Sequence, residues 1–389
     1  MRVLLITDGI YPYQMGGMQK HSYYLAKYLA KNKINVCVAH CRNETDTSPE
    51  VNHPAFKDFN LDFIDFKSFV FPSCGNFPGH YIKENKRYSK AIFDGVKQEI
   101  NKFDIIYAQG FTAYAFIRQS KKGNIKVPIV SNLHGLEMYQ KAPSVKVKLT
   151  HLLLRKITKF VSIQSDYVFS FGGEIKRINS ALGISDENIF ESPIGIEQDW
   201  LTDGITDQNS SVRNFVFVGR AERRKGTIEL RSALLNLLGN GRHPFHFHFV
   251  GPVPEEEKIS DSSITYYGLI RDEKRIKEIL KICDVMVCPS YSEGMPTVIM
   301  EAMASGLALI ATDVGAVNEQ VSNNGWLLKN SSTTAIQDAM TEAITLPSAE
   351  LKLMKSASLS KVKKHFVWDD VVKHKIACLQ DMISNTGNP

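Results

Sequence analysis

The stretch Asp284–Val321, DVMVCPSYSEGMPTVIMEAMASGLALIATDVGAVNEQV, carries the clearest structural pattern in the chain. It opens with an apolar run, Val285–Cys288, and a Ser-Glu-Gly-Met-Pro turn. Apolar side chains then recur at helical spacing, at Val298, Ile299, Ala302 and Met303. Pro296 stands at the expected first helical position and Gly306 just beyond the last, the usual start and stop signals. A second apolar run, Ala308–Ala311, follows, so we predict a strand–turn–helix–strand unit with two buried parallel strands.

The same alternation of strands and helices recurs along the whole chain, interrupted by the polar stretch LTDGITDQNSSVR at 201–213. Such a composition is typical of a domain boundary. The 389 residues are enough for two domains. We therefore predict an α/β protein with two Rossmann-like, doubly wound domains facing a cleft, residues 1–200 and 201–365.

The composition argues against a membrane-spanning protein and against a disulfide-rich one. No apolar run approaches the roughly 20 residues that a membrane span needs. The six cysteines are scattered without a CxxC pair, so free thiols in a reducing cytoplasm are expected. The net charge of +6 comes from residues 1–200, which hold 26 Lys and Arg against 19 Asp and Glu.

Two carboxylates flank the predicted helix start, Glu293 in the turn and Glu301 within the helix. The backbone N–H groups of Gly294–Thr297 would be available for a phosphate, because the first amides of a helix have no partner within it. Carboxylates repel phosphate, so we expect them to accept hydrogen bonds from sugar or ribose hydroxyls. The alternative is an acid that only complements the helix dipole.

A second candidate is the segment FVFVGRAERRKG at 215–226, in which Arg220 and Lys225 follow a strand. Cations beyond the carboxyl end of a strand suit a diphosphate. A solvated charged loop is the alternative, although both segments fall in one domain and at strand ends, which favours a joint anion site.

In the first domain, Gly16 and Gly17 follow the first strand, and His134 follows a later one. The glycine pair lacks the GxGxxG spacing of a nicotinamide-cofactor site. Close approach of backbone to a ligand and a plain turn are both compatible with it. The histidine is open to a structural or a functional role.

Together these motifs resemble family 4 glycosyltransferases of the GT-B fold, the retaining family marked by an E-x7-E motif. The resemblance rests on Glu293-Gly294-Met295-Pro296 with Glu301, on Gly219-Arg220 with Lys225-Gly226, on Val250-Gly251-Pro252, on Gly268, on Pro193-Ile194-Gly195, on Gly16-Gly17 and on His134-Gly135. The closing Phe366-Val367-Trp368-Asp369 resembles the start of the family's last helix, which implies that 366–389 packs back on the N-terminal domain.

The resemblance also implies roles. Arg220 and Lys225 would neutralise the donor diphosphate, and His134 would touch the donor sugar. Glu301 would bind the ribose, and Leu269 and Ile270 would lie by the base. The glycine pair Gly16 and Gly17 would approach the diphosphate. The remaining donor contacts would come from Glu293 together with Gly294, Met295, Pro296, Thr297 and Val298. No metal or other cofactor is expected.

We therefore expect a retaining transferase that moves a sugar from a UDP- or GDP-sugar to a saccharide or lipid-linked acceptor, in surface polysaccharide, lipopolysaccharide or glycolipid synthesis. The alternatives are a sugar-nucleotide epimerase or phosphorylase of the same fold, and a catalytically silent, membrane-associated subunit that binds sugar nucleotides. Residues 42–85 and the region after His134 would select the acceptor.

The segment 141–160 contains six Lys and Arg residues among apolar side chains, and no acid occurs between Glu137 and Asp166. It is expected to form a helix that contacts an anionic membrane at the cytoplasmic face. The alternative is a helix packed on its own domain with a solvated basic face. Aromatic residues are not interleaved as stacking platforms, so no nucleic-acid partner is expected.

Overall fold

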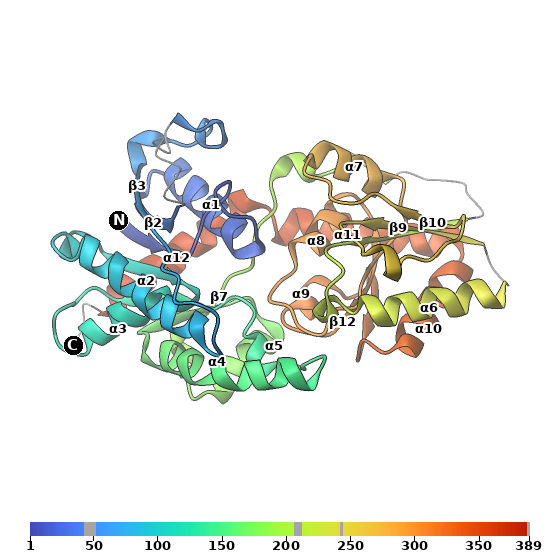
Figure 1. Cartoon of the computed structure of the whole chain (residues 1–389). Coiled ribbons are helices and arrows are strands. Elements are labelled where there is room, and N and C mark those ends of the chain that lie inside the picture. Colours follow the sequence, from blue (N-terminus) through green and yellow to red (C-terminus); the bar gives the residue numbers. More distant parts are fainter. Residues whose placement is uncertain (43–51, 206–211, 242–243, 387–389) are drawn as a thin grey trace. The chain divides into compact units, whose positions relative to one another are not determined.

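The computed structural model describes residues 1–42, 52–205, 212–241 and 244–386, which form two compact units (Figure 1). Unit 1 comprises Met1–Tyr139, Leu149–Ile194 and Trp368–Pro389, and unit 2 comprises Gln140–Lys148 and Gly195–Val367. The sequence predicts a boundary between residues 200 and 201, which places 140–148 in the first domain. In the structure, the contacts of 140–148 group this segment with unit 2. Residues 206–211 of the expected linker and 43–51 of the expected acceptor region lie outside the described residues.

Unit 1 is built on a seven-stranded parallel sheet of order β3-β2-β1-β4-β5-β6-β7. Its strands are β1 (Arg2–Ile6), β2 (Asn35–Cys41), β3 (Ile64–Phe69), β4 (Ile105–Gln109), β5 (Ile129–Asn132), β6 (Tyr167–Ser170) and β7 (Ile189–Glu191). Its helices are α1 (Gly17–Lys31), α2 (His80–Val96), α3 (Tyr114–Ser120), α4 (Val145–Gln164), α5 (Gly173–Ala181) and α12 (Trp368–Thr386). Through α12 the end of the described chain joins the first unit, where Trp368 is fully buried and stacks on Tyr28 of α1.

Unit 2 contains a six-stranded parallel sheet of order β10-β9-β8-β11-β12-β13. Its strands are β8 (Arg213–Val218), β9 (Phe245–Val250), β10 (Ile264–Tyr266), β11 (Val285–Cys288), β12 (Ala308–Thr312) and β13 (Gly325–Leu328). Its helices are α6 (Thr227–Asn240), α7 (Glu273–Lys281), α8 (Thr297–Ala304), α9 (Val317–Gln320), α10 (Thr333–Thr345) and α11 (Ser348–His365). The prediction of two Rossmann-like α/β domains with parallel sheets is confirmed.

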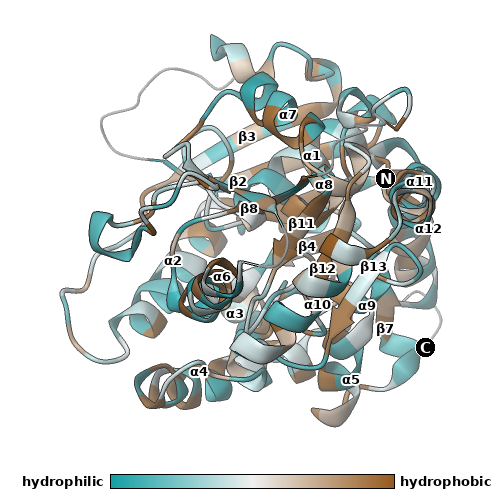
Figure 2. Ribbon diagram, turned by 90° about the vertical axis from the view of Figure 1, so that its right-hand side faces the viewer, coloured by the Kyte–Doolittle hydropathy of each residue, from teal (hydrophilic) through white to brown (hydrophobic). Residues whose placement is uncertain are grey.

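Each unit has its own apolar core, because strands covered on both faces must be apolar throughout. All four residues of β11 and all five of β12 are buried. Figure 2 shows these strands, and β4 of unit 1, as strongly hydrophobic. The core of unit 1 includes Tyr88, Phe116 and Val161, and that of unit 2 includes Phe215, Phe247 and Ile336.

Three local expectations were wrong or incomplete. Pro296 is the N-cap of α8, with extended backbone (ψ 121°), so the helix begins one residue later than expected. The sequence predicts a helix over Tyr88–Asn101, whereas α2 runs from His80 to Val96. Strand β13 was not anticipated, because only Leu328 of its four residues is buried, so the strand carries little pattern.

Candidate active site

The sheet of unit 2 changes direction of progression between β8 and β11, which are neighbours in space. Ligands of open α/β sheets bind at the carboxyl ends of the strands at such a switch point. The segments that follow these two strands are 219–226 and 289–296, the same two that the sequence singled out. The fold therefore brings the predicted Arg220–Lys225 and Glu293–Val298 groups to one edge of one sheet.

Glu293 is the centre of this edge. It is only 7% exposed, and its Oε1 accepts hydrogen bonds from Lys225 Nζ at 2.6 Å and from Ser290 Oγ at 2.7 Å. Arg224 Nη1 donates to its Oε2 at 3.4 Å. Burial alone would raise the pKa of Glu293, but Lys225 and Arg224 outweigh burial and hold that pKa below its ordinary value. The carboxylate is thus ionised and already neutralised by protein cations.

The other arginines of the loop after β8 have different partners. Arg223 makes a forked pair with Glu229, at 2.9 and 2.7 Å, and Tyr291 OH donates to the same carboxylate at 2.8 Å. Arg223 therefore braces the loop against α6. Arg220 is exposed, and its Nε pairs with Glu222 Oε1 at 2.9 Å, so its guanidinium reaches solvent at the strand end.

The start of α8 offers hydrogen-bond donors next to these cations. In the described part of the chain, no acceptor is found for the backbone N–H groups of Gly294, Thr297 and Val298. Free amides at a helix N-terminus, beside Lys and Arg side chains, form an anion site. Met295 is buried, Glu301 lies half-buried further along α8, and Leu269 and Ile270 follow β10.

The turn that carries Glu293 is held by backbone contacts from two other segments. The Ala316 N–H donates to the carbonyl of Gly294 at 2.7 Å. A Cβ on Gly315 would lie 2.2 Å from the carbonyl oxygen of Glu293, so only glycine fits there. Gln140, grouped with unit 2, pairs its amide with the Glu293 backbone, donating to the carbonyl at 2.6 Å and accepting from the N–H at 3.2 Å.

In unit 1, Gly16 caps α1 and Gly17 begins it, and a Cβ on Gly17 would meet no atom within 4 Å. His134 follows β5 in a left-handed backbone conformation (φ 56°). Its N–H donates to Asn132 Oδ1 at 2.9 Å, and its Nε2 is hydrogen-bonded to Gln109 Oε1. Burial and, secondarily, Lys375 lower the pKa of His134 to about 3, so the ring is neutral at physiological pH.

The sequence reasoning missed the partners of Glu293. Arg224 was visible as a cation in the loop, but nothing distinguished it from Arg223, because their different roles come from tertiary packing. Ser290 lies in the turn without any motif, and Gln140 lies 153 residues away from Glu293. Across the described residues, no cluster of three or more His, Cys, Asp or Glu side chains is arranged to hold a metal ion.

Two family models cover most of the chain. The model described as Glycosyltransferase Family 4 matches residues 15–199, and the model described as Glycosyl transferases group 1 matches residues 212–345. The chain belongs to the family 4 glycosyltransferases. One family model lies within the predicted first domain and the other within the predicted second domain, so both domains match glycosyltransferase models.

Individual relatives of this family 4 chain are distant. A glycosyltransferase of Bacillus subtilis provisionally assigned to teichuronic acid biosynthesis, TuaC, is 26% identical over 67% of this chain and 66% of its own length. The UDP-Gal:alpha-D-GlcNAc-diphosphoundecaprenol alpha-1,3-galactosyltransferase of Escherichia coli is 30% identical over 30% of this chain and 32% of its own length. The matched region thus spans about two thirds of the length of the Bacillus subtilis relative and about one third of the length of the Escherichia coli relative.

The fold is shared with solved structures over the whole chain. Sucrose-phosphate synthase from Thermosynechococcus elongatus superposes with a TM-score of 0.78 at 16% identity, covering 99% of both chains. At this identity the likeness shows the fold alone. The GT-B prediction is thereby confirmed.

Proposed function

We propose that the chain is a retaining, metal-independent transferase that moves a sugar from a UDP- or GDP-sugar to a saccharide or lipid-linked acceptor in the synthesis of a surface polysaccharide or glycolipid. The observation that carries the proposal is the cluster at the β8/β11 switch point, where Lys225 and Arg224 contact Glu293, just before the free amides that begin α8, and Arg220 lies on the same loop as these two cations. The names of the two relatives above support the proposal, since one is provisionally named for teichuronic acid biosynthesis and the other for UDP-Gal and a diphosphoundecaprenol-linked sugar.

In the proposed reaction the cluster binds the donor diphosphate and stabilises the negative charge that grows on it as the sugar leaves. Arg220 reaches the leaving group from solvent, and the amides of Thr297 and Val298 bind phosphate oxygens. Glu293 holds Lys225 and Arg224 in place and offers its remaining lone pairs to sugar hydroxyls. Glu301 binds the ribose, with the base near Leu269 and Ile270.

The proposal also assigns roles to His134 and Gly17 of unit 1. Neutral His134, whose Nε2 donates to Gln109 Oε1, accepts a hydrogen bond from a sugar hydroxyl at Nδ1 and adds no positive charge. Gly17 has open space above it, which leaves room for phosphate oxygens. Retention without a protein nucleophile means attack from the face of the leaving group, with the leaving phosphate taking the acceptor's proton, so the protein's part is positioning and charge stabilisation.

A thermal-shift panel of nucleotide sugars tests the donor, because a bound ligand stabilises the folded state by mass action. The stabilising donor is then incubated with acceptor saccharides and EDTA. Release of free nucleoside diphosphate only with acceptor, and a product of unchanged anomeric configuration by NMR, are expected. Epimerised donor would indicate the epimerase alternative, transfer to inorganic phosphate the phosphorylase, and binding without turnover the silent subunit.

We further propose peripheral contact with an anionic membrane through 141–160, at the cytoplasmic face. Helix α4 keeps Val145, Leu149, Leu152 and Leu153 exposed. Burial of exposed apolar side chains beside cations is what binds amphipathic helices to anionic bilayers. Sedimentation with phosphatidylglycerol vesicles, and release by salt, are expected; equal binding to neutral vesicles would contradict the electrostatic part.

A further inference from the structure

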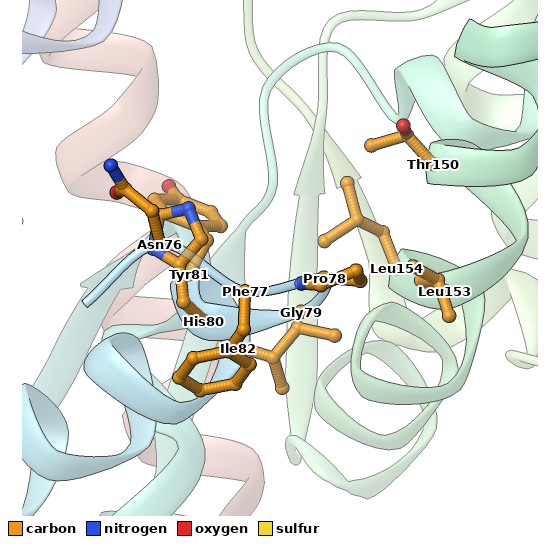
Figure 3. A pocket seen from close by; sticks show the side chains of 10 residues that line it. All are labelled: Asn76, Phe77, Pro78, Gly79, His80, Tyr81, Ile82, Thr150, Leu153 and Leu154. Carbon is orange, nitrogen blue, oxygen red and sulfur yellow. The ribbon is translucent and has the colours of Figure 1, made fainter. Parts of the chain in front are cut away.

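Unit 1 contains a surface hollow of about 580 Å³ that no part of the proposed donor site uses (Figure 3). One wall is the loop and first helical turn formed by 76–82, and the other is the middle of α4, with Thr150, Leu153 and Leu154. Its volume falls within the range of about 300–1,000 Å³ that is typical of small-molecule sites.

The lining of the hollow is mostly hydrocarbon. Ile82 and Leu154 pack against the core of unit 1 and form its floor, while Phe77 and Leu153 remain 42% and 50% exposed at its rim. A saccharide site needs several convergent hydrogen-bonding groups, and the polar lining side chains here are limited to Asn76, His80, Tyr81 and Thr150. The surface therefore favours an apolar ligand over a sugar.

The wall formed by 76–82 is fixed rather than loosely attached. Glu84, 7% exposed, accepts hydrogen bonds from the Cys74 N–H at 2.9 Å and from the ring of His80 at 3.0 Å. This contact ties the loop to the first turn of α2. These two hydrogen bonds also engage the carboxylate of Glu84, the acidic side chain that α2 carries near the hollow.

One cation lies at the rim of the hollow, and others occur nearby on α4. Lys83 Nζ lies 5.7 Å from the centre of the Phe77 ring, Arg155 and Lys156 follow the lining residues in sequence on α4, and Arg155 donates to the Met138 carbonyl at 2.9 Å. Helix α4 contains no acid in its 20 residues. An apolar hollow beside cations is complementary to an amphiphile with an anionic head, in which the hydrocarbon chain fills the hollow and phosphate meets the lysines.

We propose that this hollow binds the isoprenoid chain of a phosphate- or diphosphate-linked lipid acceptor next to its head group. The inference rests on the lipid-linked acceptor of the proposed function and adds where its chain lies. A flat bilayer would contact the convex ridge of α4 at Leu149 and Leu152, whereas a hollow accommodates one chain that has left the bilayer. Across the described residues no helix is both long and apolar enough to cross the membrane itself.

The test uses the purified full chain, saturated with whichever of UDP and GDP the thermal-shift panel shows to bind, and titrates farnesyl diphosphate against inorganic diphosphate by calorimetry. Farnesyl diphosphate is expected to bind, and inorganic diphosphate to bind at least tenfold more weakly. Leu153→Asn is expected to raise the Kd for farnesyl diphosphate roughly tenfold, since burying a leucine side chain accounts for about that factor. Leu152→Asn, at 49% exposure on the same helix but outside the lining, should change it less than twofold.

Leu153→Trp, which fills the hollow without adding polarity, is expected to abolish binding of the farnesyl compound. Equal affinity for both diphosphates, or equal weakening by Leu153→Asn and Leu152→Asn, would overturn the proposal and leave contact with a bilayer surface. The affinity for that nucleotide is measured on each variant as well. If neither UDP nor GDP binds, the proposed function fails, while the farnesyl titration still decides whether the hollow takes a lipid chain.

Discussion

At the scale of single residues, the ion pair between Glu293 and Lys225 decides whether the donor edge of unit 2 keeps its shape. Both side chains are largely buried, at 8% and 18% exposure, so removing Glu293 would leave Lys225 without its carboxylate, and removing Lys225 would leave Glu293 with Arg224 and Ser290 alone. We expect Glu293→Gln and Lys225→Met each to lower the free energy of unfolding by about 2–3 kcal/mol. The double variant should cost clearly less than the sum, with a coupling of about 1–2 kcal/mol in urea denaturation. Additive losses would show that the pair contributes little.

Lys375 is a second residue whose charge is expected to affect the folding stability measurably. It is fully buried, and its Nζ lies 4.2 Å from the centre of the Phe169 ring and has no hydrogen-bond partner within the described ranges. Burial lowers the pKa of Lys375 from 10.5 to about 7. Because the folded state holds this proton less tightly than the unfolded state, folding stability should rise with pH between about 7 and 10.5.

Lys375→Met keeps the side-chain volume and removes the buried charge. We expect it to raise the free energy of unfolding at pH 7 by on the order of 3 kcal/mol and to remove the gain in stability toward pH 10. Lys373→Met, on the same helix at 68% exposure, is the control and should leave the pH dependence intact. Denaturant titrations at both pH values measure this, and a destabilised Lys375→Met protein would mean that the ammonium has an unseen stabilising contact.

At the scale of elements, Gly226 joins the cationic loop to α6 and presses it against the end of β11. Its φ is 69°, and a Cβ would lie 2.1 Å from the carbonyl oxygen of Pro289. Gly226→Ala must therefore move the loop that carries Lys225, and we expect it to cost about 2–4 kcal/mol of stability and to weaken UDP binding. Gly241→Ala is the matched control, because its φ of 56° is also left-handed but nothing lies within 4 Å, so it should cost only about 1 kcal/mol and leave UDP affinity unchanged.

The elements also show how far sequence could lead. The unit from β11 through α8 to β12 was predictable, because a buried parallel strand is a continuous apolar run and its neighbours are fixed by the β/α alternation. The start of α2 was not, because its first two turns are polar and are held by the contacts of Glu84 with the Cys74 N–H and His80. The donor edge was predictable as a set of residues that follow strand ends. The pairing of Lys225 and Arg224 with Glu293 was not, since it depends on how two loops pack.

At the scale of the whole molecule, the two cores share no residue, so the units should unfold as separate cooperative steps. Trp368 belongs to unit 1 although it lies only one residue beyond the last segment of unit 2, and it contacts His21, Tyr24 and Tyr28. Calorimetry of the wild-type chain is expected to show two transitions. UDP or GDP, whichever binds, at about one hundred times its Kd should raise the stability of one of them by about 2.7 kcal/mol, because the charged contacts of its proposed phosphate site lie in unit 2.

Trp368→Ala should lower the stability of the transition that belongs to unit 1. Truncating a fully buried tryptophan costs about 3–5 kcal/mol, and that cost should fall on unit 1, whose α1 and α12 lose their shared packing. The transition that UDP raises is expected to stay where it is in this variant. If the variant lowers both transitions together, or UDP raises both, the units fold as one cooperative body, and the separate cores would not be independent in stability.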